Sequence, residues 1–194
     1  MQGDQYIEII RPLLSKKRFE HSLQVARSAA ALAVQYGADP EQAYTAGILH
    51  DIMKDTDGRK QLQIIENSGI IFGTLDRAEP KLWHAKAGAA YVRHSLGLDD
   101  AAIVDAIACH TTAKAGMTLL DKVLFLADFI SEDRDYDGVE EMRAATARSM
   151  EEGLDVALSF SITDLVERRR VVHPDTLDAY NELVLQQREK GRAY

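Results

Sequence analysis

Four histidines of this chain lie where amphipathic helices would place core residues. They are His21, His50, His84 and His110, and each repeats with aliphatic or small residues at helical spacing. An imidazole buried without a partner costs roughly 1 to 3 kcal/mol, and a single inward histidine is usually a hydrogen-bonded core residue. Four such histidines on separate helices instead favour one shared polar centre, because imidazole nitrogen is a frequent metal ligand.

Asp128 points to the same centre with a stronger group. It interrupts the apolar stretch VLFLADFI, where an unpaired carboxylate would destabilise the fold or become protonated. An arginine or a metal ion could neutralise it, and the inward histidines favour the metal. Asp51 directly follows His50, so the pair spans about 100° of a helix and can serve one ion or bridge two. Mixed imidazole and carboxylate ligands suit Fe, Mn, Co or Zn better than Ca.

The elements that must position these groups are predicted to be helices. Strong helix formers dominate the 194 residues, Gly (12) and Pro (4) are scarce, and no alternating run rich in Val, Ile and Thr appears. The sequence therefore predicts one all-α domain, 1–194. Helices are expected near 5–13, with Pro12 ending or kinking the first, and near 15–36, 40–54, 59–66, 80–96, 100–110, 118–130, 139–169 and after 173.

Capping residues set several of these boundaries. Gly37 is expected to end the second helix, and Asp39 to begin the third as its N-cap, with the Gln42 side chain reaching back. Thr118 and Asp121 are spaced as a capping box at the start of the helix that carries Asp128.

Composition excludes several classes of function. The chain has 23 Lys plus Arg against 31 Asp plus Glu, a net charge of −8, and so lacks the basic footprint of a nucleic-acid binder. Its single cysteine, Cys109, cannot form an intrachain disulfide and is expected to be a buried hydrophobe. No apolar run approaches the ~20 residues that span a bilayer, and the N-terminus lacks the pattern of a secretory signal. We therefore expect a cytoplasmic protein that binds neither nucleic acid nor membrane.

The order of His21, the His50–Asp51 pair and Asp128 resembles the signature of the HD-domain metal-dependent phosphohydrolases, an all-α superfamily. Four segments, RFEHSLQVA, AGILHDIMKD, HTTAKAGMTLLDKVLFLAD and DRDYDGVEEMR, are similar to the bacterial symmetrical diadenosine tetraphosphate hydrolases (YqeK-like). The similarity covers about residues 5 to 185. This sequence departs from the family pattern after Asp128, where Ser131 and Glu132 stand in place of a common Glu-Pro pair.

The resemblance implies an HD-domain helical bundle and a set of metal ligands. In that family pattern His21, His50, Asp51 and Asp128 bind iron or another transition metal beside the scissile phosphate. His84 and His110 would be the extra ligands of a second ion, or would hydrogen-bond phosphate oxygens. One or two ions are compatible with this ligand set.

Basic side chains near these ligands are expected to bind the substrate's phosphates. Lys54 lies one turn after the His50–Asp51 pair and could neutralise a phosphate or assist the leaving group, although lysine is also common at a helix C-terminus. Arg18 shares a helix face with His21. Arg134 matches the family's loop arginine and could clamp a phosphate bidentately.

Three more residues are expected to contact the substrate. Thr111 follows His110 and could donate a hydroxyl hydrogen bond, or merely end the helix. Arg170 and His173, the latter in the HPDT segment, match the family, although a residue before proline in a turn needs no catalytic reason.

The resulting hypothesis is a metal-dependent hydrolase that cleaves diadenosine tetraphosphate symmetrically into two ADP. Asp51 would position the attacking water while Lys54, Arg18 and Arg134 offset the polyphosphate charge. The ligand would be a small nucleotide, with an ADP or GDP-like product, and a homodimer fits the family. Three alternatives remain: an HD phosphohydrolase of a nucleoside monophosphate, cyclic nucleotide or guanosine alarmone, a di-iron oxygenase, and a non-catalytic nucleotide sensor.

Overall fold

The computed structural model describes residues 2–191, and over that range its regular elements are helices without strands. The α-helices are α1 (Gln5–Ile10), α2 (Lys16–Tyr36), α3 (Pro40–Leu49), α4 (Gly58–Asn67), α5 (Thr74–Ala78), α6 (Trp83–His94), α7 (Ala101–Cys109), α8 (Leu119–Ile130), α9 (Val139–Arg148), α10 (Met150–Glu167) and α11 (Pro174–Glu189). Two 3-10 turns, η1 (Gln2–Asp4) and η2 (Pro80–Leu82), complete the set. The predicted all-α class is confirmed.

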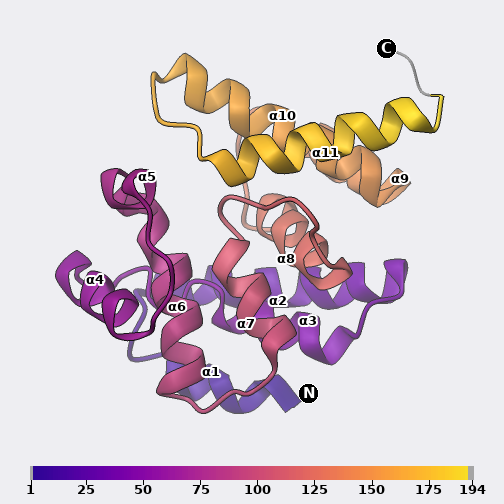
Figure 1. Ribbon diagram of the computed structural model, residues 1–194. Coiled ribbons are helices and arrows are strands. Elements are labelled where there is room, and N and C mark those ends of the chain that lie inside the picture. The colour runs from indigo at the N-terminus through magenta and orange to yellow at the C-terminus, as the bar shows by residue number, and fades with distance from the viewer. Residues whose placement is uncertain (1, 192–194) are drawn as a thin grey trace.

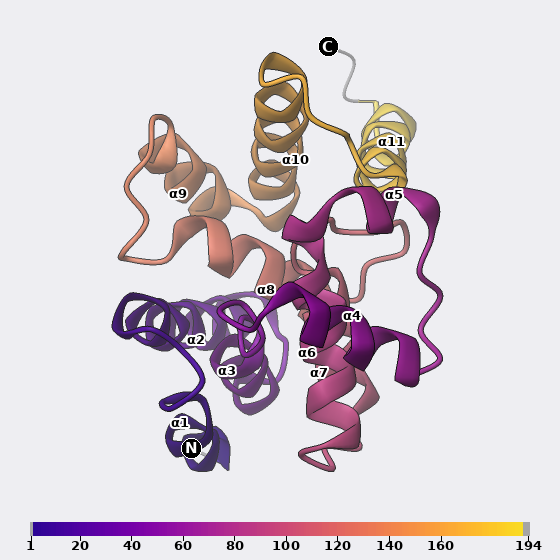
Figure 2. The same cartoon turned by 90° about the vertical axis from the view of Figure 1, so that its left-hand side faces the viewer.

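Helix α8 lies at the centre of the molecule. It packs against α2, α3 and α7 on one side and against α9 and α10 on the other. Figure 1 shows α9, α10 and α11 gathered at the top, above α8, with α2 and α3 below it. Figure 2 shows α4 beside α6, with α5 above them, away from α2 and α9. The His50–Asp51 pair and Asp128 therefore come from segments of the chain that meet in the interior.

A very close approach of α2 and α3 sets the position of the first two histidines. A Cβ atom on Gly47 would lie only 2.4 Å from Cα of Ala26, so only glycine fits there. Small residues let the two backbones touch, and the rings of His21 on α2 and His50 at the end of α3 come within 5.3 Å of each other, centroid to centroid.

Two helix boundaries differ from prediction. Helix α3 ends at Leu49 instead of near Lys54, and residues 50–55 form successive turns. The predicted helix 139–169 is two helices, because Ser149 is extended (φ −159°, ψ 152°) and caps α10 by accepting from the Glu152 N–H. Both breaks fall among good helix formers, so propensity alone does not reveal them.

The predicted caps are confirmed with one exception. Gly37 is left-handed (φ 81°) after α2, and the Asp39 carboxylate accepts from the N–H groups of Glu41 and Gln42. The Gln42 side chain does not reach back; its amide donates to Asp100 Oδ2 at 2.8 Å and ties α3 to the start of α7. The short helix α5 forms between the helices predicted near 59–66 and 80–96, where no helix is predicted. Within residues 2–191, no helix combines the length and apolarity needed to cross a bilayer.

Candidate metal centre

The four inward histidines form a continuous row, which we call the histidine row. Its order is His21, His50, His110 and His84, with neighbouring ring centroids 5.3, 5.0 and 5.2 Å apart. All four are buried. Helix α2 carries the first, α6 carries the last, and the two between them follow the last residues of α3 and α7. The structure thus brings together imidazoles that lie up to 89 residues apart in the sequence.

Backbone carbonyls fix the tautomer of three of these rings. In His50, His84 and His110, Nδ1 lies 2.8, 2.9 and 2.7 Å from the carbonyl oxygen three residues earlier, which can only accept. Nδ1 therefore donates, and in the neutral ring Nε2 carries a lone pair directed into the centre. Burial lowers the pKa of His50 to about 4 and also lowers the pKa of His84, so both rings are neutral at neutral pH.

Lys54 donates toward one of these lone pairs, with its Nζ 3.1 Å from Nε2 of His84. Nε2 of His84 and Nε2 of His110 are 3.3 Å apart, and Nε2 of His50 is buried without a hydrogen bond. Oδ1 of Asp51 is likewise buried and makes no hydrogen bond. Unpartnered buried acceptors cost about 1–3 kcal/mol each, so this donor-poor cluster fits a bound cation.

Asp51 places its two carboxylate oxygens toward different parts of the histidine row. Oδ2 lies 3.6 Å from Nε2 of His50, while Oδ1 lies 3.1 Å from Nε2 of His84 and 3.7 Å from Nε2 of His110. Ligand atoms within 4.8 Å of one another come from His21, His50 and Asp51, and again from Asp51, His84 and His110. The geometry can hold one divalent ion, or two with Asp51 shared between them.

Asp128 has the arginine partner that its sequence context allows, and it also contacts the histidine row. Its Oδ1 lies 3.0 Å from Nε2 of His21 and 3.9 Å from Nε2 of His50, and it also accepts from Nη2 of Arg134. A third group of candidate ligands joins Asp128 to His50 and His110. Burial raises the pKa of Asp128, but Arg134 and then His21 more than offset this and hold it well below its usual 3.8.

The predicted basic residues surround the carboxylates. Arg18 Nη1 lies 3.1 Å from Asp51 Oδ2, and Lys54 Nζ lies 3.1 Å from Nε2 of His84 and 3.8 Å from Asp51 Oδ1. Lys54 belongs to a turn rather than a helix, with its N–H donating to the Asp51 carbonyl. Burial lowers the pKa of Lys54, and Asp51 opposes this shift. Burial raises the pKa of Asp51, and the surrounding imidazoles and Lys54 hold it well below 3.8.

Asp133 belongs to the centre and was missed in the sequence. Its Oδ2 lies 2.8 Å from Nδ1 of His21. Asp133 therefore accepts a hydrogen bond from Nδ1 of His21, as backbone carbonyls do from Nδ1 of the other three rings. A carboxylate in this place orients an imidazole and raises its basicity toward a metal. The sequence does show an acidic residue just after the helix that carries Asp128, but acidic residues are common in such loops and do not by themselves indicate a contact to a histidine.

Thr111, Arg170 and His173 meet in one cavity beside the histidine row. This cavity, which we call the first cavity, has a volume of about 190 Å³ and also includes Lys81 and Arg168. Lys81 supplies the carbonyl that fixes His84, and Thr111 follows His110, so the cavity adjoins that end of the row.

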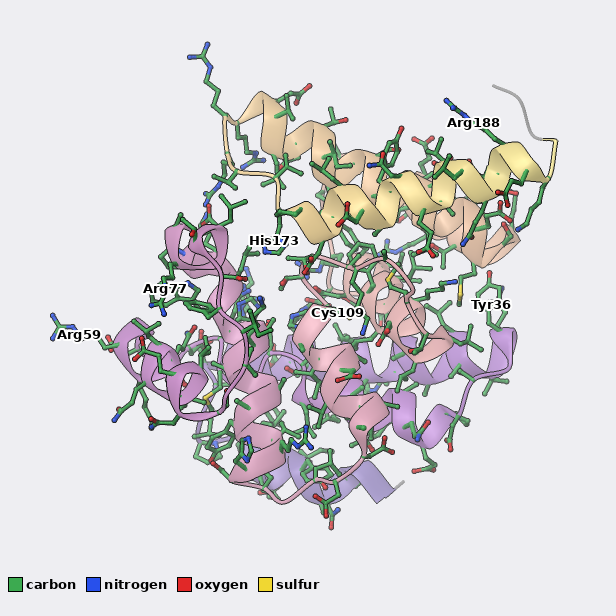
Figure 3. All side chains as sticks on the ribbon, in the orientation of Figure 1. Tyr36, Arg59, Arg77, Cys109, His173 and Arg188 are labelled. Carbon is green, nitrogen blue, oxygen red and sulfur yellow. The ribbon has the colours of Figure 1, made fainter. Side chains whose placement is uncertain are left out.

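His173 also has a structural role. Its Nδ1 accepts from the Asp175 N–H at the start of α11, and its Nε2 lies 3.3 Å from Asp76 Oδ1. Figure 3 shows it between the start of α11 and the segment near α5. Arg170 pairs with Glu79 at 2.5 Å, so both residues link the α10–α11 turn to the α5–η2 segment.

Comparisons with known proteins place these residues in a family. Residues 18–133, which include all six candidate metal ligands, match the model described as "HD domain". The symmetrical bis(5'-nucleosyl)-tetraphosphatase of Halalkalibacterium halodurans is 34% identical over 188 residues, 97% of this chain and 100% of that protein. The enzyme of the same name from Bacillus subtilis is 34% identical over 184 residues, covering 95% of this chain and 98% of that protein.

A solved structure agrees with the sequence relatives. A crystal structure from Clostridium acetobutylicum, described as a predicted HD superfamily hydrolase involved in NAD metabolism, superposes with a TM-score of 0.91. It is 32% identical and covers 94% of this chain and 97% of its own. The chain therefore belongs to the HD domain superfamily and, within it, to the family of the bacterial symmetrical bis(5'-nucleosyl)-tetraphosphatases.

Proposed function

We propose that this protein hydrolyses diadenosine tetraphosphate symmetrically into two ADP. The observation that carries the proposal is near full-length similarity to symmetrical tetraphosphatases, combined with a buried cluster in which Nε2 of His50 and Oδ1 of Asp51 make no hydrogen bond. Both features are expected of a metal-dependent phosphohydrolase. The net charge of −8 leaves the binding of a polyanion to local cations, and Arg18, Lys54 and Arg134 supply them at this cluster.

The metal ligands in this proposal are His21, His50, Asp51 and Asp128, with His84 and His110 completing a second position. Their imidazoles and carboxylates suit Fe, Mn, Co or Zn, and we propose iron as the native metal. When bound, such an ion supplies a water of lowered pKa and withdraws charge from a phosphoryl oxygen. Asp133 would hold His21 in its ligating orientation through the 2.8 Å contact to Nδ1.

The reaction breaks the central bridge of the tetraphosphate. The oxygen of a water molecule bonds to one central phosphorus atom, and the bridging oxygen leaves with the other half, so both products are ADP. Asp51 is buried, ionised and shared by the two groups of ligands, which suits it to orient that water. Lys54 is close to Asp51 and His84 and could donate a proton or a hydrogen bond to the departing oxygen.

Arg18 and Arg134 are the proposed phosphate contacts. Each guanidinium now contacts a carboxylate of the cluster, Asp51 and Asp128 respectively. If those carboxylates served a cation, their charge would be neutralised by it, leaving guanidinium N–H groups available for phosphate oxygens.

Product analysis tests this function. Protein purified without chelator, analysed for metal and then supplied with Fe²⁺ or Mn²⁺, should convert diadenosine tetraphosphate to ADP alone. ATP plus AMP would show asymmetrical cleavage and overturn the proposal. If diadenosine tetraphosphate survives while a nucleoside monophosphate, cyclic nucleotide or guanosine alarmone is consumed, that nucleotide is the substrate instead. Oxygen-dependent turnover would indicate an oxygenase, and nucleotide binding without any turnover would indicate a sensor.

A further inference from the structure

A second cavity lies at the opposite end of the histidine row from the first. It has a volume of about 260 Å³ and is lined by His21 together with Lys17, Arg18, Arg134 and Tyr136. His21 begins the row, whereas the first cavity adjoins His84 and His110 through Lys81 and Thr111. The cluster of candidate metal ligands therefore has a cavity at each end.

A dinucleotide cut at its centre needs such an arrangement. If the proposed function holds, the two central phosphates must lie at the cluster, and one nucleoside must extend to either side of it. Thr111, Arg170 and His173, the contacts expected from the sequence, all line the first cavity and can serve only one half of the substrate. The other half needs a receptor near the His21 end.

Tyr136 gives the second cavity the character of a nucleobase site. Its hydroxyl donates to the Phe129 carbonyl at 3.0 Å, and its ring packs against Phe160 with centroids 5.2 Å apart. These contacts hold the ring in place while it remains half-buried at the cavity wall. A fixed aromatic ring is a favourable surface for stacking a base, because little side-chain freedom is lost on binding.

Charge in the second cavity suits the phosphates that join this base to the cluster. Arg18 and Arg134 line the same cavity as Tyr136 and contact Asp51 and Asp128, and Lys17 adds an exposed ammonium to the lining. Two acids line the same cavity: Asp133, whose Oδ2 lies 2.8 Å from Nδ1 of His21, and the exposed Asp135. Cations and an aromatic ring together are the usual elements of a nucleotide site.

We propose that the second cavity binds the second nucleotide half of the substrate, with Tyr136 as the stacking surface for its base and Lys17 as a phosphate contact. This inference rests on the proposed function. It predicts two ADP molecules bound per chain, one in each cavity, and a contribution of Tyr136 to substrate binding rather than to the chemical step.

Calorimetric titration of the metal-reconstituted protein with ADP tests the stoichiometry. The wild type should bind two ADP per chain, and Tyr136→Leu should retain one. Tyr136→Leu should also raise the KM for diadenosine tetraphosphate roughly five- to hundredfold with a much smaller change in kcat. Tyr136→Phe is the matched control, since it keeps the ring and removes only the hydroxyl, and its KM should stay near that of the wild type.

Lys17→Glu provides an independent variant at an exposed position, where folding is not at risk. It should raise the KM and weaken one of the two ADP sites, and it decides the question if Tyr136→Leu fails to fold. A single ADP per chain in the wild type, or wild-type KM values in both Tyr136→Leu and Lys17→Glu, would overturn this inference while leaving symmetrical cleavage intact. A wild type that does not cleave diadenosine tetraphosphate would instead overturn the proposed function.

Discussion

Nε2 of His84 faces Nε2 of His110 at 3.3 Å, and the Nδ1 atom of each ring donates to a backbone carbonyl. Two imidazoles that donate from Nδ1 in this arrangement present their Nε2 atoms to each other, which is unfavourable unless positive charge lies nearby, and Lys54 Nζ lies 3.1 Å from Nε2 of His84. Oδ1 of Asp51, buried and without a hydrogen bond, lies 3.1 Å from the first of these nitrogens. The folded chain thus contains a preformed site for positive charge.

Asp133 should control metal affinity without being a ligand. Asp133→Asn keeps the size of the side chain but removes the charge that orients His21, and we expect metal affinity to fall about 10- to 100-fold. Asp135→Asn, an exposed acid in the same loop, is the matched control and should bind metal like the wild type. Competitive titration with a chromophoric chelator measures both; equal affinities for the two variants would exclude this role.

Gly47 should be intolerant of any side chain. In Gly47→Ala the new Cβ would meet the Ala26 backbone at 2.4 Å, so α2 and α3 must separate, at a cost of about 1–3 kcal/mol in the free energy of unfolding. Gly88→Ala on α6 is the control, because its Cβ would meet its nearest neighbours at an ordinary 3.5 Å. Urea unfolding should show a lower midpoint for the first variant only; equal midpoints would contradict the close approach.

Cys109 should be unreactive in the native protein. It is buried, and burial raises the pKa of its thiol to about 12, so at pH 8 only about one molecule in 10⁴ carries the reactive thiolate. A thiol-specific chromogenic reagent at pH 8 should therefore detect one thiol per chain in guanidinium and almost none in buffer. Rapid stoichiometric labelling of the folded protein would refute this expectation.

Asp76 should stabilise the α5 segment in a pH-dependent way. Burial raises its pKa, but Lys86, the Gly73 N–H and His173 outweigh burial and hold the pKa below its usual 3.8. A carboxyl whose folded pKa is lowered contributes stability above the unfolded pKa and loses it as the pH falls through the folded pKa. Asp76→Asn should thus lower the free energy of unfolding at pH 7, and the deficit should shrink below about pH 3.8.

The measurement for Asp76 is urea unfolding of the wild type and Asp76→Asn at a series of pH values. Asparagine can still accept from the Gly73 N–H, so the difference isolates the charge. Asp178→Asn, at an exposed position on α11, should show no such deficit. A deficit that stays constant from pH 7 to pH 3 would contradict the linkage.

Residues on strongly amphipathic helices could be placed from the sequence. His21, His84 and Asp128 each interrupt an apolar helical face, so burial and convergence follow from periodicity, and the capping box of Thr118 and Asp121 follows from local spacing. Residues whose roles depend on loop geometry could not be placed. Asp133 and Tyr136 lie between α8 and α9, where no periodicity states which way a side chain faces.

Tertiary contacts account for the remaining differences. Gln42 has the spacing of a capping-box residue, but Asp100 from a distant segment offers its amide a better-placed acceptor. Ser149 is surrounded by helix formers, yet the turn there lets α10 fold back along α9 and pack on α8. Such choices depend on partners that are far apart in sequence.

Metal titration of Asp51→Asn tests the central claim most directly, because Asp51 belongs to the groups of ligands at both ends of the histidine row. Chelator-stripped wild type should bind one or two Mn²⁺ per chain by calorimetry. Asp51→Asn should lose this binding while keeping its fold, and Asp99→Asn, at an exposed position, should bind like the wild type. Wild-type stoichiometry and affinity in Asp51→Asn, or no binding by the wild type, would contradict an ion-centred site.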